Sequence, residues 1–124
     1  MTNPVERLAA LGLTLPPVVP PVAAYVPAVR TGGFVYVSGQ LPVVDGKLLA
    51  VGKVGGEVSA PAAAGLARTC ALNALAAAAA AAGGLEAIRR VVKVTGFVAS
   101  AVPQDVREVT APDLANTDAK GKRA

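Results

Sequence analysis

The segment from Ser59 to Gly84 constrains the fold of this 124-residue chain more than any other segment. Ser59 is a strong helix N-cap residue, Pro61 suits the first helical turn, and Gly83-Gly84 is a typical helix terminator. Between them, seven consecutive alanines at residues 76–82 favour helix and let a neighbouring backbone approach closely. The sequence therefore predicts one long helix that ends at about residue 82 and packs against a sheet.

This predicted helix has one face with a spacing of three to four residues, as expected for a helix that covers a sheet. The face is formed by Leu66, Thr69, Cys70, Asn73, Ala76 and Ala77. Cys70 is the only cysteine, so an intramolecular disulfide is impossible and a reducing compartment is expected. We interpret Cys70 as a small buried apolar residue.

Segments with the residue pattern of strands precede and follow the predicted helix in the sequence. A Gly-Gly turn precedes an apolar strand at Phe34–Val37, and Asp45-Gly46 predicts a type I′ hairpin within residues 43–49. Apolar residues on both faces predict a further strand at Arg90–Ala99. The predicted class is α+β, a mixed sheet with helices on one face.

The N-terminal region predicts two further elements. Asn3 and Pro4 suit the start of a short helix, which Gly12 ends. Four prolines at residues 16–21 then forbid helix and predict an extended connector.

Composition excludes several classes of function. The chain has no histidine and one cysteine, which argues against a zinc or other soft-metal site and against Ser-His or Cys-His catalysis. The net charge of +4 is scattered, with a single local cluster at Arg89, Arg90 and Lys93, so nucleic-acid binding is disfavoured.

The same composition bears on location and assembly. Glu6 and Arg7 interrupt any N-terminal apolar run, and the apolar stretch at residues 74–85 is too short to span a bilayer, so we expect a cytoplasmic protein without a membrane partner. Apolar residues make up 53% of the chain but aromatic residues only 3%, which predicts a thin core and extra burial by oligomerisation.

The corner Ser38-Gly39 follows the first predicted strand directly. A strand that ends on a small polar corner presents backbone N–H groups and a hydroxyl, which can hold a carboxylate or an oxyanion. The alternative is a turn that merely ends the strand. Ser38 and Gly39 are therefore candidate site residues.

Residues 15–99 resemble the Rid family of reactive-intermediate deaminases, also called YjgF. The resemblance rests on the residues of the Gly33–Pro42 segment with its Ser-Gly-Gln-Leu-Pro corner, on Pro20-Pro21 leading to Tyr25, on Gly46, and on the segments 71–75, 83–85 and 91–98. It implies a chorismate-mutase-like subunit in a homotrimer with small-molecule clefts between subunits. It also implies hydrolysis of reactive enamines and imines, such as 2-aminoacrylate, to 2-keto acids and ammonia, without metal or organic cofactor.

The resemblance implies that Tyr25 borders the substrate cleft and that Ser38 and Gly39 contact the substrate or the attacking water. Tyr25 could equally be an aromatic plug over a thin core. Some family members carry endoribonuclease labels.

The sequence departs from the family after Ala99. Family members continue with a second helix and further strands, which carry an arginine that grips the substrate carboxylate and a late glutamate. Here residues 100–124 are polar and aperiodic, so we expect an incomplete Rid-like domain at 1–99 and a disordered tail at 100–124. We assign neither role to Arg107, Arg123 or Glu108.

Three hypotheses follow from this departure. The chain is an imine deaminase, a non-catalytic trimeric protein that binds imines or keto acids, or a truncated or frame-altered inactive product.

Overall fold

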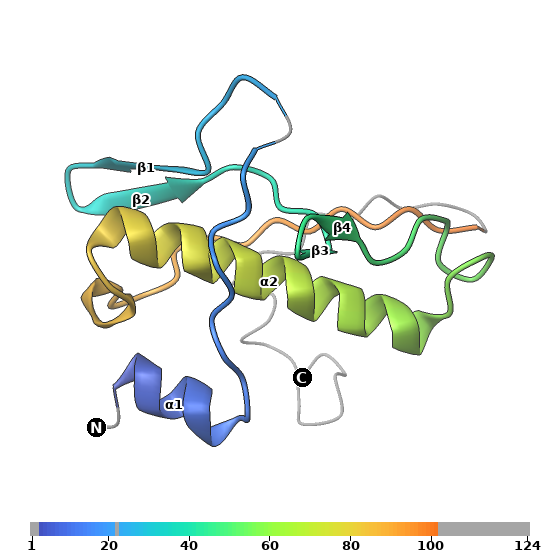
Figure 1. Ribbon diagram of the computed structural model, residues 1–124, viewed down its shortest axis with the longest axis horizontal. Helices are drawn as coiled ribbons and strands as arrows, with labels where there is room; N and C mark the ends of the chain where they lie inside the picture. The colour runs from blue at the N-terminus through green and yellow to red at the C-terminus, as the bar shows by residue number, and fades with distance from the viewer. Residues whose placement is uncertain (1–2, 22, 102–124) are drawn as a thin grey trace.

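The computed structural model describes residues 3–21 and 23–101 (Figure 1). Two helices, two β-hairpins and one 3-10 turn make up the described chain. In order they are α1 (Pro4–Ala10), β1 (Ala28–Thr31), β2 (Phe34–Val37), β3 (Val43–Val44), β4 (Lys47–Leu48), α2 (Ala60–Ala82) and η1 (Leu85–Ala87).

Helix α2 has the boundaries that its end signals predict. The Ser59 hydroxyl oxygen accepts a hydrogen bond from the Ala62 N–H at 3.2 Å, which satisfies one of the free donors at the helix start. At the other end Gly83 adopts the left-handed conformation, with φ of 90°. The buried residues of α2 are Asn73, Ala76, Ala77 and Ala79, and the helix contacts β1, β2, β3 and η1. The predicted sheet-facing side is therefore confirmed around Asn73 and the alanines.

Both hairpins are antiparallel and turn on residues with positive φ. Strands β1 and β2 pair from Ala28 opposite Val37 to Thr31 opposite Phe34, around a Gly-Gly turn. Strands β3 and β4 are joined by Asp45 and Gly46, whose φ angles are 51° and 76°. Positive φ at both central residues is the type I′ geometry that the Asp-Gly pair predicts.

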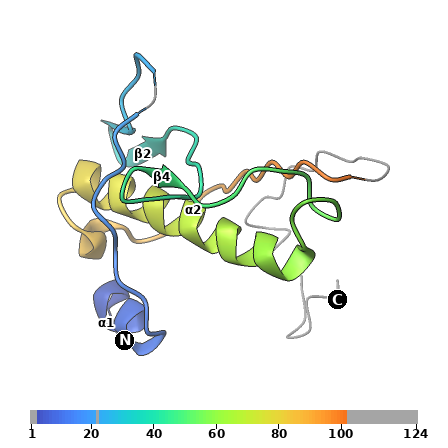
Figure 2. The ribbon, with the colours of Figure 1, turned by 45° about the vertical axis from the view of Figure 1, so that its right-hand side comes forward.

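The elements form layers around α2. Both hairpins lie on one side of α2 and α1 lies on the other side (Figures 1 and 2). The segment 13–21, which contains the prolines, has no regular secondary structure. It crosses α2 and connects the α1 side to the side of the hairpins (Figure 1). The predicted α+β class is confirmed, although the described strands form two separate two-stranded sheets rather than one mixed sheet.

The predicted strand at Arg90–Ala99 is wrong for the described chain. Residues 90–99 form no strand with another described residue. At the end of the segment the Val54 N–H donates to the Ala99 carbonyl at 2.8 Å, and the Ala101 N–H donates to the Val54 carbonyl at 2.9 Å. The apolar pattern predicts extended backbone correctly, but a strand also needs a neighbour that pairs along its length.

The N-terminal helix matches its prediction. The Asn3 side chain accepts from the Glu6 N–H at 2.9 Å, and the Glu6 carboxylate accepts from the Asn3 N–H at 3.2 Å, which together form a capping box. Gly12, with φ of 71°, follows the end of α1.

The core of the described chain is thin, as the composition predicts. Its buried apolar residues are Val58, Ala76, Ala77, Ala79 and Leu85. Large apolar side chains remain exposed on the β1–β2 hairpin and the 91–98 segment, including Phe34 at 55%, Tyr36 at 63% and Phe97 at 79%. Contiguous exposed apolar surface is typical of interaction sites, and the predicted burial by oligomerisation stays a prediction.

Among the described residues, α2 alone has the length and apolar composition of a membrane-spanning helix. A core helix of a soluble protein meets the same criterion, and α2 packs against both hairpins.

Candidate functional site

Ser38 fastens the corner that follows β2 to the chain that precedes β1. Its N–H donates to the Pro27 carbonyl at 2.9 Å, and its hydroxyl donates to the same carbonyl at 3.0 Å. The hydroxyl proton is therefore engaged within the protein. Ser38 holds the corner in place, and its oxygen keeps only acceptor capacity for a ligand.

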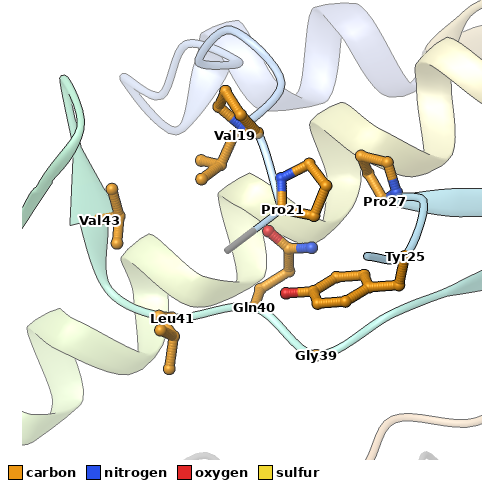
Figure 3. Close-up of a pocket in the computed structure, with 9 residues that line it drawn as sticks. Val19, Pro21, Tyr25, Pro27, Gly39, Gln40, Leu41 and Val43 are labelled. Carbon is orange, nitrogen blue, oxygen red and sulfur yellow. The ribbon is translucent and has the colours of Figure 1, made fainter. Parts of the chain in front are cut away.

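Tyr25 and Gly39 line one small cavity beside this corner (Figure 3). Pro21, Pro27, Gln40 and Leu41 also contribute to its wall, and the Tyr25 and Gln40 side chains lie next to each other. The cavity volume is about 20 Å³, enough for roughly one water molecule. Its dimensions suit an ordered water better than an organic substrate.

Gly39 leaves the corner open on one side. A Cβ atom built at Gly39 would meet no atom within 4 Å. Within the part of the chain that the structure describes, the Gly39 N–H donates no hydrogen bond. An unengaged backbone N–H at an open corner, next to a phenol, is an arrangement that can receive a carboxylate or a developing anion.

Asn73 connects the corner to helix α2. Its side-chain Nδ2 donates to the Leu41 carbonyl at 3.1 Å and to the Val43 carbonyl at 3.0 Å, and the residue is 1% exposed. This one amide therefore sets the position of the segment that follows Gln40. The sequence places Asn73 on the buried face of the helix, but the i+3/i+4 spacing carries no information about which carbonyls it would reach.

The structure brings two of the three predicted site residues together. Tyr25 and Gly39 line the same cavity, whereas the Ser38 hydroxyl is directed to Pro27 and Ser38 does not line it. Gln40 lines the cavity without having been predicted, although its position inside the Ser-Gly-Gln-Leu-Pro corner was the available signal. Arg107, Glu108 and Arg123 lie outside the described residues.

Cys70 lies half-buried on α2, and burial raises the pKa of its thiol above the ordinary value. Because the thiolate is the reactive form, we expect Cys70 to react with a disulfide reagent at pH 8 several-fold more slowly in the native chain than in urea. Stopped-flow absorbance of the released thiol measures both rates. Equal native and denatured rates would contradict the burial of this thiol.

No group of three histidine, cysteine, aspartate or glutamate residues is placed to hold a metal ion among residues 3–21 and 23–101.

Comparison with known proteins places the chain among a set of related sequences and structures. Residues 5–115 match the family described as "YjgF/chorismate mutase-like, putative endoribonuclease". The match extends past the boundary predicted at residue 99, and that boundary stays a prediction. A Trypanosoma cruzi relative, protein TCP17, is 37% identical over 94 residues, which are 76% of this chain and 59% of that protein.

Two solved structures share the fold. A protein of unknown function from Agrobacterium tumefaciens is 44% identical with a TM-score of 0.67, over 81% of this chain and 60% of that one. A protein from Shewanella oneidensis described as a "putative endoribonuclease" is 36% identical with a TM-score of 0.63, over 68% and 56% of the two chains. The chain spans less than two thirds of the length of each of these relatives.

Proposed function

This chain belongs to the YjgF/chorismate mutase-like family, and from that premise we propose that it hydrolyses reactive enamines or imines of the 2-aminoacrylate type to 2-keto acids and ammonia. The observation that carries the proposal is the water-sized cavity between the Tyr25 phenol and the open Gly39 corner.

The chemistry needs few protein groups. An enamine such as 2-aminoacrylate first gains a proton from water at its terminal carbon and loses one from nitrogen, which gives the imine. One water then adds to the imine carbon and forms a C–O bond, the nitrogen takes up both protons of that water, and the C–N bond breaks to give a ketone and ammonia. A phenol can donate a hydrogen bond to the imine nitrogen or to the attacking water, and a backbone N–H can donate to the substrate carboxylate. In this proposal Tyr25 holds the water, Gly39 receives the carboxylate, and Ser38 positions Gly39.

The cavity of one chain is too small for the substrate, so the proposal includes a second wall supplied by another subunit. The exposed apolar residues of β2, Phe34 and Tyr36, support such an assembly, because burying them removes a large apolar area from water. We propose the homotrimer that the family resemblance implies, with the substrate cleft between subunits.

The test is imine turnover by the full chain. A dehydratase that acts on serine supplies 2-aminoacrylate, and absorbance follows its decay with and without this protein. We expect faster decay with the protein, and a loss of about a hundredfold in kcat/KM for Tyr25→Phe, the range seen when one transition-state donor is removed.

Tyr36→Phe is the matched control, because Tyr36 does not line the cavity and the substitution keeps the aromatic ring that is proposed to be buried between subunits. It is expected to keep the wild-type rate. A wild-type decay rate equal to that in buffer would refute the deaminase proposal. Cleavage of RNA by the same preparation would instead favour the activity named for the Shewanella relative.

A binding protein without turnover is the second candidate. None of the arginines in the described residues lines the cavity, so the described chain offers no bidentate grip on a carboxylate. Saturable binding of pyruvate by calorimetry, together with a buffer-level decay of the imine, would establish this alternative.

A further inference from the structure

A second and larger cavity lies between the proline-containing segment and the β3–β4 hairpin. Its volume is about 300 Å³, near the lower end of the range for small-molecule sites. Residues 16–20 form one wall, residues 43–46 of the β3–β4 hairpin form the opposite wall, and Asn73 of α2 completes it. The imine chemistry proposed above does not use this cavity.

Asn73 presents an acceptor to this cavity. Both N–H groups of its amide are engaged by the carbonyls of Leu41 and Val43, which also settles which side-chain atom is the nitrogen. The Asn73 Oδ1 accepts no hydrogen bond from a described residue. Every fully buried side-chain N or O atom among the described residues has a hydrogen-bond partner, so Oδ1 is not fully buried. The small exposed remainder of Asn73, 1% of the residue, therefore includes Oδ1, an oxygen that reaches the cavity.

The other polar side chain of the cavity is also an acceptor. Asp45 lines the cavity from the hairpin turn, and its carboxylate forms no ion pair with a described residue. No lysine or arginine lines the cavity, and the prolines at 16, 17 and 20 lack an N–H. The walls are otherwise mostly valine and proline, so the cavity combines an apolar surface with two acceptors.

From this arrangement we propose that the cavity is a binding site for a small primary amine with an apolar body. The ammonium group donates to Asn73 Oδ1 and lies near the Asp45 carboxylate, and the apolar body contacts the valines and prolines. Val19, Pro20 and Val43 line both cavities, so the amine site shares a wall with the Tyr25 cavity (Figure 3).

Benzylamine is the probe, and phenylacetate is the control with the same ring and the opposite charge. In an NMR titration of the ¹⁵N-labelled full chain, we expect saturable shifts with benzylamine at residues 43–46 and at the Asn73 side-chain amide, and none with phenylacetate. The absence of saturable binding, or equal binding of phenylacetate, would overturn the proposal.

Two variants locate the site without disturbing the hydrogen bonds of Asn73. Asp45→Asn keeps a residue that tolerates positive φ and removes the charge, so benzylamine binding is expected to weaken about fivefold. Val18→Phe fills the larger cavity alone and is expected to abolish the shifts, whereas Val51→Phe, at a residue 79% exposed and outside both cavities, is not. Unchanged affinity in both Asp45→Asn and Val18→Phe would place the amine elsewhere and refute the site.

Discussion

Asn73→Asp is expected to lower the free energy of unfolding by about 3 kcal/mol. The substitution keeps the shape of the side chain but replaces two donors with a carboxylate oxygen that faces the carbonyls of Leu41 and Val43 at about hydrogen-bond distance. The residue is 1% exposed, so only its edge at the larger cavity is open to water and the new charge is poorly solvated. The deficit should shrink at acid pH, because a protonated aspartic acid can again donate one hydrogen bond.

Urea denaturation followed by far-UV circular dichroism measures the loss. Thr69→Ala is the control, since it removes a hydrogen bond of the same helix that is local, from the Thr69 hydroxyl to the Gly65 carbonyl at 3.3 Å. Its cost is expected to stay below about 0.5 kcal/mol. An equally small loss of unfolding free energy in both variants would show that the hydrogen bonds from Asn73 to the Leu41 and Val43 carbonyls contribute little to stability.

Gly52→Ala is expected to destabilise the loop between β4 and α2 by about 2 kcal/mol. Gly52 has φ of 145°, which disfavours any side chain, and an added Cβ would lie 2.6 Å from the Glu57 Cβ. Relieving this overlap displaces Glu57, whose carboxylate accepts from the Lys53 N–H at 2.8 Å. The loop also carries Val58, one of the few buried apolar residues.

Thermal unfolding measures the global effect, and hydrogen exchange of the Lys53 amide measures the local one. Gly65→Ala is the control, because that glycine lies inside α2 with open space around it and the change is expected to stabilise the helix by about 1 kcal/mol. Unchanged Lys53 exchange in Gly52→Ala would contradict the expected displacement of Glu57.

The Lys53 N–H holds the pKa of Glu57 below its ordinary value. A lowered pKa means that the contact supports the loop above the unfolded-state pKa and is lost as the pH falls through the folded-state pKa. The protection factor of the Lys53 amide is therefore expected to fall on acidification in the wild-type chain. The same pH change should have little effect in Gly52→Ala.

Local signals in the sequence predict the elements whose boundaries depend on local chemistry. Ser59, Gly83 and the Asp45-Gly46 pair act through the backbone within a few residues, and each occupies the expected position. The segment 90–99 shows the limit of this reasoning. Its apolar pattern predicts which side chains share a face, but it carries no information about whether a neighbouring strand pairs with the segment along its length.

In the candidate site, too, the sequence predicts the local features but not the contacts between residues far apart in the chain. The Ser-Gly corner lies directly after β2, as the strand pattern predicts. The direction of the Ser38 hydroxyl depends on the carbonyl of Pro27, eleven residues earlier, and no periodicity reports that contact. The Asn73 tether spans thirty residues or more and is equally invisible to spacing.

The alanine run of α2 has a consequence for how uniquely the two layers dock. The buried alanines of this run, Ala76, Ala77 and Ala79, all present the same small methyl group, so elements that pack on them find similar contacts after a shift of one helical turn. Larger interlocking side chains normally prevent such sliding. Here the Asn73 side-chain amide selects one alignment through its hydrogen bonds to the Leu41 and Val43 carbonyls. Without these bonds we expect the chain to keep helix α2 while the hairpins sample several positions along it.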